Sequence, residues 1–249
     1  MKLIVLGASS GLGRSLGIAL AQGGKNDVAL LARREDRLAG TVEEAGSTAF
    51  AVGCDVTDED NCVKAIGTAV ERLGGLDGLI YTVGVGPMGK IEDMGADVWR
   101  QALNTNVVGA AIATSAALPH LQASNGHAIY LSSISASDSR PWPGLGAYLT
   151  SKAELGKLVD AFRVEHPAIN FTRVVMGDCA GGPGDSVTGF ADAWDPELAM
   201  EMVTLWVNRG LVAGQLVPVE ELVRAVELII SSDAVTSIPT IVLTPKPAM

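Results

Sequence analysis

A tyrosine and a lysine four residues apart offer two groups that could move a proton. Tyr148 and Lys152 stand in the segment Tyr-Leu-Thr-Ser-Lys, and residues at this spacing share one face of a helix. A free phenol has a pKa near ~10 and is a poor base at neutral pH. A neighbouring ammonium stabilises the phenolate, so we expect Lys152 to lower the pKa of Tyr148. The spacing predicts Tyr148 as a general acid/base, with an ordinary exposed helical pair as the alternative.

Further polar residues could serve the same proton transfer. Ser133 follows the apolar run 128–131, at the carboxyl end of an expected strand, where its hydroxyl could hold a substrate carbonyl. Ser135 is a second candidate, because strand ends vary by a few residues. Asn106 falls in an expected helix, where a buried amide costs stability unless it is bonded, so we predict a functional role for it. Helix capping by Asn104 is a further possibility.

A glycine-rich turn follows the first apolar run of the chain. Its glycines let the backbone turn sharply and approach a pyrophosphate over the amino end of the next helix. The predicted dinucleotide contacts are Gly7, Ser9, Ser10, Gly11, Leu12 and Gly13. The same residues fit G-x-S-x-G, in which Ser9 would be a hydrolase nucleophile. Such an elbow normally follows several strands, whereas this motif opens the chain, so the dinucleotide interpretation is favoured.

Two arginines follow the second apolar run. An NAD enzyme would place an acidic residue there against the adenosine ribose, but this chain has Arg33 and Arg34. A guanidinium binds phosphate through paired hydrogen bonds, which suits the 2′-phosphate of NADP. NADP(H) is therefore favoured over NAD(H), with ordinary solvated charges at a helix start as the alternative.

In their order along the chain, these motifs resemble those of the short-chain dehydrogenase/reductase (SDR) family. The turn G-x-x-x-G-x-G, Asn106, Ser133, Tyr148 and Lys152 occur in the family's order between residues 7 and 152. The resemblance implies that hydride passes between a nicotinamide and a carbonyl or alcohol carbon. It also implies that Tyr148 gives or takes the proton, Ser133 orients the substrate oxygen, and Asn106 holds a water near Lys152. The positive charge of an oxidised nicotinamide would then act together with Lys152 to lower the pKa of Tyr148.

The resemblance assigns more cofactor contacts: Asp55 and Val56 at the adenine, then Val83, Gly84 and Gly177, besides Tyr148 and Lys152. Helix N-capping is a second role open to Asp55. The chain departs from the family at Tyr81-Thr82-Val83-Gly84, where Asn-Asn-Ala-Gly is usual, and at 176–181, which lacks the usual Pro and Thr. These departures support an alternative function, a catalytically weak cofactor-binding regulator or scaffold.

The elements that must position these residues alternate along the whole chain. Short runs rich in Val, Ile and Leu are separated by amphipathic stretches such as 12–23, and each run is typical of a buried parallel strand. The runs are 3–6, 28–31, 49–52, 78–83, 128–131, 171–175 and 238–243. Their alternation predicts an α/β fold, a doubly wound parallel sheet (Rossmann fold) with helices on both faces. We expect residues 1–249 to form a single NADP(H)-binding oxidoreductase domain.

A glycine-rich stretch breaks the alternation at 177–189 and precedes a helix expected at 196–207. We expect a substrate lid over about 177–215. Trp142 and an apolar set in this region suggest an apolar substrate, such as a fatty, steroid, polyketide or terpenoid carbonyl. The set is Trp194, Met200, Met202, Leu205 and Trp206. Helix packing or a subunit interface is the alternative, because most of these residues have helical spacing.

Composition limits the partners and the compartment. The net charge is −10 and no run of Lys or Arg occurs, which disfavours nucleic acid and anionic membranes as partners. Cys54, Cys62 and Cys179 are odd in number and widely spaced, so we expect reduced thiols in a cytoplasmic protein, without disulfides or a metal site. No apolar stretch reaches membrane-spanning length. The expected partner is a small-molecule carbonyl or alcohol, and the resemblance implies a homodimer or homotetramer.

Overall fold

Seven parallel strands form the centre of the molecule. The computed structural model describes residues 1–136, 141–232 and 235–246, and in this part the strand order is β3-β2-β1-β4-β5-β6-β7. The strands are β1 (Lys2–Leu6), β2 (Asp27–Ala32), β3 (Ala49–Gly53), β4 (Gly78–Tyr81), β5 (His127–Ser133), β6 (Asn170–Met176) and β7 (Thr240–Leu243). Each strand lies within two residues of its predicted bounds, and the predicted fold class is confirmed.

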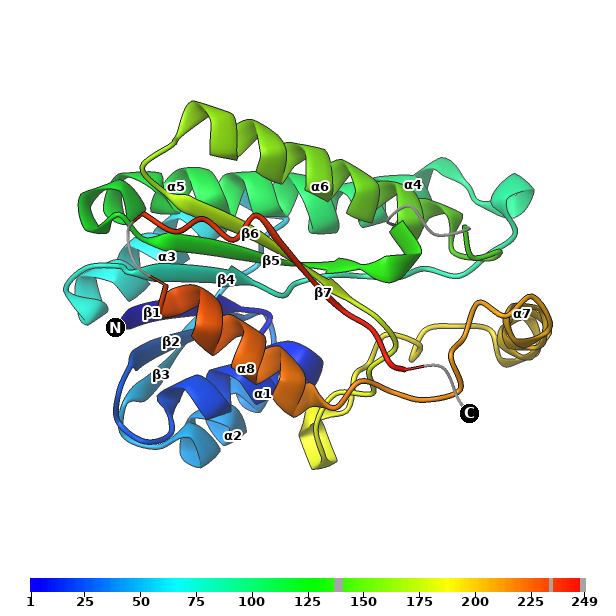
Figure 1. The fold of residues 1–249 in the computed structure, drawn as a ribbon, viewed down its shortest axis with the longest axis horizontal. Coiled ribbons are helices and arrows are strands. Elements are labelled where there is room, and N and C mark those ends of the chain that lie inside the picture. Colours follow the sequence, from blue (N-terminus) through cyan, green and yellow to red (C-terminus); the bar gives the residue numbers. More distant parts are fainter. Residues whose placement is uncertain (137–140, 233–234, 247–249) are drawn as a thin grey trace.

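Helices cover both faces of this sheet (Figure 1). They are α1 (Gly11–Ala21), α2 (Glu35–Ala45), α3 (Glu59–Leu73), α4 (Ala96–Leu103), α5 (Gly109–Ser124), α6 (Gly146–Glu165), α7 (Pro196–Asn208) and α8 (Val219–Ile230). Short helical turns are η1 (Ile91–Asp93), η2 (Asn104–Val108), η3 (Ile134–Ala136) and η4 (Gly184–Ser186). The helices α1, α2 and α8 cover one face, and α3, α5 and α6 cover the other.

Two apolar cores follow from the period of two along each strand. In β1, Leu3 and Val5 face the core under α1, α2 and α8, whereas Ile4 and Leu6 face the core under α3, α5 and α6. All four side chains are almost completely buried. Burial on both faces explains why the strands are continuous apolar runs in the sequence.

The strand order reverses between β1 and β4, which creates a crevice at the carboxyl ends of the strands. Leu6, the last residue of β1, pairs with Leu31 of β2 on one side and with Tyr81 of β4 on the other. The loops that follow these three strands therefore start side by side. Open α/β sheets bind ligands at such a point.

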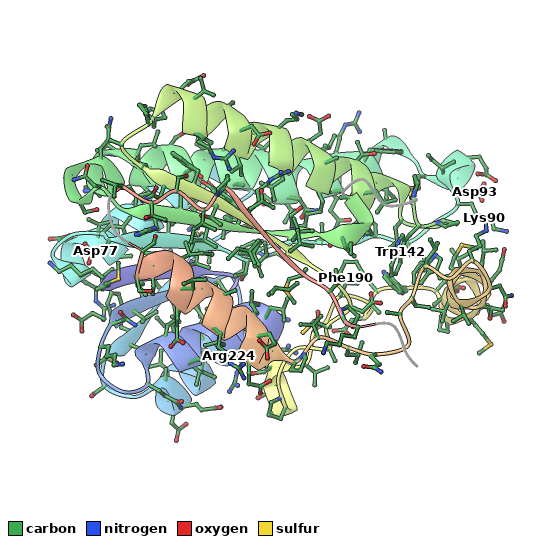
Figure 2. The ribbon with its side chains drawn as sticks, in the orientation of Figure 1. Asp77, Lys90, Asp93, Trp142, Phe190 and Arg224 are labelled. Atoms are coloured by element: carbon green, nitrogen blue, oxygen red, sulfur yellow. The ribbon has the colours of Figure 1, made fainter. Side chains whose placement is uncertain are left out.

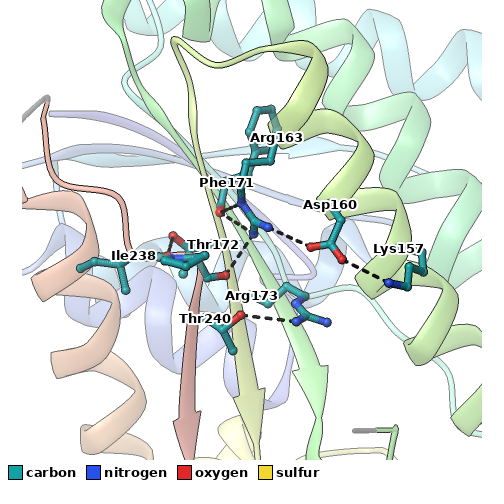
Figure 3. Close-up of polar contacts among 9 residues, drawn as sticks. Lys157, Asp160, Arg163, Phe171, Thr172, Arg173, Ile238 and Thr240 are labelled. Atoms are coloured by element: carbon teal, nitrogen blue, oxygen red, sulfur yellow. Dashed lines mark hydrogen bonds and ion pairs between the residues drawn. The ribbon is translucent and has the colours of Figure 1, made fainter.

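The far edge of the sheet is fastened by side chains of α6 (Figure 3). Arg163 donates from Nη2 to the carbonyls of Phe171 (3.0 Å) and Pro239 (3.1 Å), and its Nη1 pairs with Asp160 at 2.8 Å. Thr172 Oγ1 donates to the carbonyl of Ile238 (2.6 Å). These bonds hold the segment before β7 against β6, so a strand of only four residues completes the sheet.

The helix α7 lies apart from the two helical layers, beyond the carboxyl ends of the strands (Figure 1). This helix and the residues before it are the part of the chain where the sequence predicted a lid. Among the described residues, no helix combines the length and apolar character that crossing a membrane requires.

Candidate active site

One cavity of about 670 Å³ lies at the carboxyl ends of the strands. Its lining contains every residue predicted to contact a cofactor, and three of the four predicted catalytic residues: Gly7, Ser9, Ser10, Gly11, Leu12, Gly13, Arg33, Arg34, Asp55, Val56, Val83, Gly84, Ser133, Tyr148, Lys152 and Gly177. Asn106 is the fourth catalytic candidate and lies buried behind this surface. The same cavity therefore extends from the glycine turn to the pair formed by Tyr148 and Lys152.

The glycine turn brings the amino end of α1 to this cavity. Gly7 and Gly11 have φ angles of +88° and +56°, which side chains disfavour. A Cβ atom at Gly13 would overlap the carbonyl oxygen of Gly7, so the turn and the first turn of the helix pack without space for a side chain. The backbone N–H groups at such a helix end, together with its dipole, favour an anion.

Two guanidinium groups stand beside this turn. Arg34 donates from Nη2 to the hydroxyls of Ser9 (3.0 Å) and Ser10 (2.7 Å). Burial lowers the pKa of Arg34, and the charges of Arg37 and Arg33 lower it further. Arg33 is 65% exposed at its side chain, and its Nη1 lies 3.9 Å from Oδ2 of Asp55. Positive charge is thus concentrated at the end of the cavity beside the glycine turn.

The environment of Ser9 does not suit a hydrolase nucleophile. Ser9 lies just past the carboxyl end of β1, where its hydroxyl accepts from Arg34. The histidines of the chain lie toward the amino ends of the strands: His127 begins β5, His120 is near the end of the helix before β5, and His166 precedes β6. A general base is therefore missing beside Ser9 in the described structure, and the hydrolase alternative is wrong.

Asp55 makes a local turn and does not cap a helix. Its Oδ1 accepts from the backbone N (2.9 Å) and Oγ1 (2.7 Å) of Thr57, whereas Asp58 is the N-cap of α3 and accepts from the backbone of Asn61 (3.0 Å). Burial raises the pKa of Asp55, but the bonds from Thr57 and the charge of Arg33 outweigh it and lower that pKa overall. The capping role considered for Asp55 is therefore wrong, and its ionised carboxylate borders the cavity.

Tyr148, Lys152 and Ser133 come together across the junction of β5 and α6. Tyr148 lies in the first turn of α6 and Lys152 lies one turn later, and both line the cavity. Ser133 ends β5, and the interaction of its hydroxyl with the phenol of Tyr148 lowers the pKa of that phenol, although burial raises it overall. The hydroxyl of Ser135 lies 2.7 Å from that of Ser133 and also lines the cavity. Of the two serine candidates, Ser133 is the one whose hydroxyl affects the pKa of Tyr148.

Burial dominates the ionisation of this pair. It raises the pKa of Tyr148, and the interaction with Ser133 offsets only part of that rise. It lowers the pKa of Lys152 to about 8. The Nζ of Lys152 donates to the carbonyl of Leu131 (2.8 Å). The protein's own groups therefore do not lower the phenol pKa, because desolvation of the phenolate outweighs them. The expected lowering also includes the positive charge of an oxidised nicotinamide, and it stays a prediction.

Asn106 fastens three parts of the site to one another. It lies in η2, a turn of π-helix between α4 and α5 that interrupts regular α-helical bonding. Its Oδ1 accepts from the backbone N of Val85 (2.9 Å), and its Nδ2 donates to the carbonyl of Val85 (2.9 Å) and to Ser151 Oγ (2.8 Å). The two amide protons are bound by protein groups. Asn104 is exposed and takes the C-cap position of α4, where its backbone N–H donates to the carbonyls of Arg100 and Gln101, so the capping role considered for it is confirmed.

The residues that depart from the family at 81–84 have structural partners. The hydroxyl of Tyr81 donates to the carbonyl of Thr105 in η2 (2.6 Å), and Thr82 Oγ1 donates to the carbonyl of Leu6 at the end of β1. Gly84 lies beside Lys152, because a Cβ atom there would be 3.3 Å from Nζ of Lys152. Different side chains therefore hold the end of β4 against its neighbours.

A segment that we call the closing segment, residues 181–194, folds back over the cavity. Its first part docks on α1, where buried Arg14 donates from Nη1 to Ser186 Oγ (2.8 Å) and pairs through Nη2 with Glu44 (2.7 Å). Thr188 then packs beside Gly11. Farther on, the ring of Phe190 lies 4.9 Å from that of Tyr148 between centroids. The closing segment thus touches both the glycine turn and the tyrosine.

Sequence reasoning missed Arg14, Ser186 and Phe190. Arg14 directly follows the glycine turn, and an arginine on the buried side of a helix is a weak signal for a partner elsewhere. Ser186 and Phe190 lie among glycines without any period, so no local pattern could have identified their contacts. Gly177 was predicted, and it lines the cavity while its N–H donates to the carbonyl of Leu243 (2.7 Å).

The apolar set around α7 is mostly a packing cluster. Met202 and Trp206 are buried against Trp142 and Leu145, whereas Met200 is 74% exposed on the other side of α7. Of the set singled out in the sequence, Trp142 alone lines the cavity in the described structure. For Met202 and Trp206, helix packing is the correct interpretation and the substrate wall is wrong.

Known proteins with similar sequences are dehydrogenases and oxidoreductases. A model of the short chain dehydrogenase family matches residues 2–182. An uncharacterized oxidoreductase of Listeria innocua is 30% identical over 167 residues, 66% of either chain. The 11-beta-hydroxysteroid dehydrogenase A of Sesamum indicum is 34% identical over 182 residues, 70% of this chain and 51% of that one. The match thus spans about half of the Sesamum enzyme and just under two thirds of the Listeria protein.

A third relative is the trans-4-hydroxycyclohexanecarboxylate dehydrogenase of Sinomonas cyclohexanicum, 32% identical over 191 residues, 70% of this chain and 74% of that one. Among solved structures, a short-chain dehydrogenase from Streptomyces avermitilis has a TM-score of 0.80 at 25% identity, covering 97% of this chain and 86% of the other. An alcohol dehydrogenase from Thermococcus sibiricus, complexed with 5-hydroxy-NADP, has a TM-score of 0.79 at 22% identity, covering 97% and 94%. The likeness to the Thermococcus enzyme shows a common fold.

Proposed function

The chain belongs to the short-chain dehydrogenase family, and from this membership we propose that it is an NADP(H)-dependent oxidoreductase. It would transfer a hydride between the nicotinamide and a small-molecule carbonyl or alcohol, with Tyr148 as the general acid/base. The observation that carries the proposal is the single cavity lined by the glycine turn, by Tyr148 and by Lys152. A site for a dinucleotide and a site for proton transfer are thereby adjacent.

The residues present fit a dinucleotide. The glycine turn leaves no room for a side chain at Gly13, and the amino end of α1 offers backbone N–H groups to a pyrophosphate. Asp55 and Val56 border the cavity beyond β3, where an adenine amine could donate to the carboxylate. Gly84 allows backbone to lie close to Lys152. These groups would hold the two ends of the nucleotide apart along the cavity.

The preference for NADP(H) follows from charge. Arg33 and Arg34 border the cavity after β2, and Arg34 is already oriented by Ser9 and Ser10. A 2′-phosphate could bind both guanidinium groups and the two hydroxyls, whereas the ribose hydroxyl of NAD would leave two like charges close together. Asp55 neutralises only part of this charge, from 3.9 Å.

NADPH, when bound, supplies the hydride that goes to the carbonyl carbon. In this direction Tyr148 donates its phenolic proton to the carbonyl oxygen, and Ser133 orients that oxygen by a hydrogen bond. The raised pKa of Tyr148 keeps the phenol protonated at neutral pH, which suits a proton donor. Lys152 is still largely an ammonium at that pH, and its charge stabilises the phenolate left behind. Asn106 positions Ser151 and Val85 around this pair.

Two relatives are named as dehydrogenases of a hydroxysteroid and of a hydroxycyclohexanecarboxylate. We propose a ketone or secondary alcohol as the substrate here as well. The alternative of a cofactor-binding regulator has less support, because Tyr148, Ser133 and Lys152 are assembled and the substituted residues at 81–84 have structural partners. A homodimer or homotetramer in the cytoplasm remains our expectation, and the three free thiols agree with a reducing compartment.

A titration of NADPH against NADH tests the proposal. We expect the wild-type protein to bind NADPH more tightly, and Arg34→Ala to weaken NADPH by about 10- to 100-fold through loss of charge-assisted hydrogen bonds, with little effect on NADH. Arg224→Ala is the control, because Arg224 lies on α8 and pairs with Glu221 away from the cavity. Equal affinity for both nucleotides would refute the NADP preference, and binding of neither would refute the dinucleotide site.

A further inference from the structure

The ring of Phe190 lies across the cavity beside the proposed proton donor. Its centroid is 4.9 Å from that of Tyr148, with the planes at 64°, an edge-to-face contact. On its other side the ring packs so closely on Gly86 that a Cβ atom there would overlap it. Phe190 is therefore wedged between α6 and the segment after β4, at the end of the cavity where Figure 2 places Trp142.

An aromatic chain holds Phe190 in this position. Its ring contacts Trp194 at 5.2 Å, Trp194 contacts Trp206 at 6.1 Å, and Trp206 contacts Trp142 at 5.1 Å. The indole N–H of Trp194 donates to the carbonyl of Gly86 (2.7 Å), and that of Trp206 donates to the carbonyl of Pro143 (2.8 Å). Both indole donors are thus bound by backbone, so these two rings are fixed and offer no hydrogen bond to a ligand.

Apart from Ser133 and Lys152, the side chains packed around Tyr148 are mainly apolar. Its packing cluster includes Trp142, Leu145 and Met88, and these three also line the cavity. Away from the glycine turn and Ser133, the lining also contains the uncharged polar side chains of Gln101 and Thr105. A ligand that reaches Tyr148 therefore meets mainly carbon.

Four of the charged side chains that line the cavity, Arg33, Arg34, Asp55 and Lys152, have their own partners. The guanidinium groups interact with Asp55, Ser9 and Ser10. Lys152 donates to a backbone carbonyl. Burial raises the pKa of Asp178, and the backbone of Ala213 offsets part of that rise. The charge of Asp192 raises the pKa of Arg34. A polar or charged substrate would find few free partners at the Tyr148 end.

We infer that Phe190 sets the upper size of the substrate, and that the substrate carries its carbonyl or hydroxyl on an apolar ring. This inference rests on the proposed function for the role of Tyr148 and adds the class of compound. A flat or alicyclic ring can pack against Phe190 and Trp142 while its single oxygen reaches Tyr148 and Ser133. A second fused ring would collide with Phe190, whose ring cannot move away without breaking its contacts with Gly86 and Trp194.

Binding of three ketones tests the inference separately from turnover. The probes are cyclohexanone, the bulkier 2-adamantanone and the polar dihydroxyacetone, titrated by calorimetry against the protein saturated with NADP⁺. We expect wild type to prefer cyclohexanone to both others. Phe190→Ala should shift the affinity ratio toward 2-adamantanone by about tenfold or more, the scale on which pockets discriminate small apolar groups. Phe190→Leu serves as a second, milder variant if the alanine variant folds poorly.

Phe50→Ala is the matched control, because Phe50 lies under Arg72 on β3 and outside the cavity. It should leave all three affinities unchanged. If dihydroxyacetone binds as tightly as cyclohexanone, the inference that the substrate carries an apolar ring is wrong. If the affinity ratio is unchanged in both Phe190 variants, Phe190 does not limit the size of the substrate. A wild-type protein that shows these binding preferences but reduces no ketone with NADPH would support the inference and contradict the proposed hydride transfer.

Discussion

The residues up to Lys152 and the closing segment build the same cavity by different means. Before Lys152, each site residue follows a strand or occupies a helix whose position is set by backbone pairing within the sheet. The closing segment is held mainly by a few side-chain contacts, from Ser186 to Arg14 and from Phe190 to Tyr148 and Gly86. The family match ends at residue 182, where the closing segment begins. The difference suggests that the proton-transfer groups belong to a fixed framework, and that ligand selection belongs to the closing segment.

The largest effect is expected from the framework, through the ionisation of Lys152. Its pKa of about 8 means that the ammonium is present below that pH and is lost above it. The pKa of Tyr148 lies above its usual value, so the phenol stays protonated over this range and does not cause the expected fall in rate. The kcat/KM for ketone reduction should therefore fall about tenfold per pH unit above roughly pH 8.

A charge that does not titrate provides the control for this pH profile. Lys152→Arg keeps a cation at all accessible pH values, so its remaining activity should lose the fall near pH 8. Circular dichroism at each pH checks that both proteins remain folded. A wild-type profile that stays flat to pH 10, or an identical fall in both proteins, would contradict the role of Lys152.

A smaller, local effect is expected from the closing segment. Ser186→Ala removes the hydroxyl that Arg14 binds, so the segment should open more often and be cleaved several-fold faster in limited proteolysis. The KM for a ketone should rise a few-fold, while kcat changes little because Tyr148 and Lys152 are unmoved.

Ser231→Ala is the matched control, because Ser231 bonds to the end of α8 far along the chain from the cavity. Its cleavage pattern should equal that of wild type. If Ser186→Ala leaves proteolysis unchanged, the contact with Arg14 does not hold the closing segment in place. If it reduces kcat as strongly as it raises KM, the closing segment and the proton-transfer groups do not have separate roles.

Much of the framework could be predicted from sequence because its signals are local. Apolar runs gave every strand to within two residues, since a strand buried on both faces needs continuous apolar side chains. The glycine turn, Ser133, Tyr148 and Lys152 could be placed because each has a fixed position relative to a strand or along a helix. The parallel sheet then brings these residues together at the carboxyl ends of its strands.

The remainder depends on contacts between distant segments. The docking of Ser186 on Arg14 spans 172 residues, and no periodicity marks either partner. For a related reason, the spacing predicts a cation near Tyr148 but does not show how completely the fold removes the phenol from water, which raises its pKa. Asp55 and Asp58 both fit a helix start in sequence, and only the backbone path shows which one caps α3.

The three tyrosines allow the most direct test of the central claim, that the phenol of Tyr148 transfers the proton. Tyr148→Phe removes only that hydroxyl, and Tyr130→Phe makes the same change at a buried residue bonded to Thr114 outside the cavity. In single-turnover reduction of cyclohexanone by bound NADPH, Tyr148→Phe should be slower by about 10²–10⁴-fold with unchanged NADPH affinity, and Tyr130→Phe should match wild type. Equal rates in the wild type and Tyr148→Phe would contradict the account.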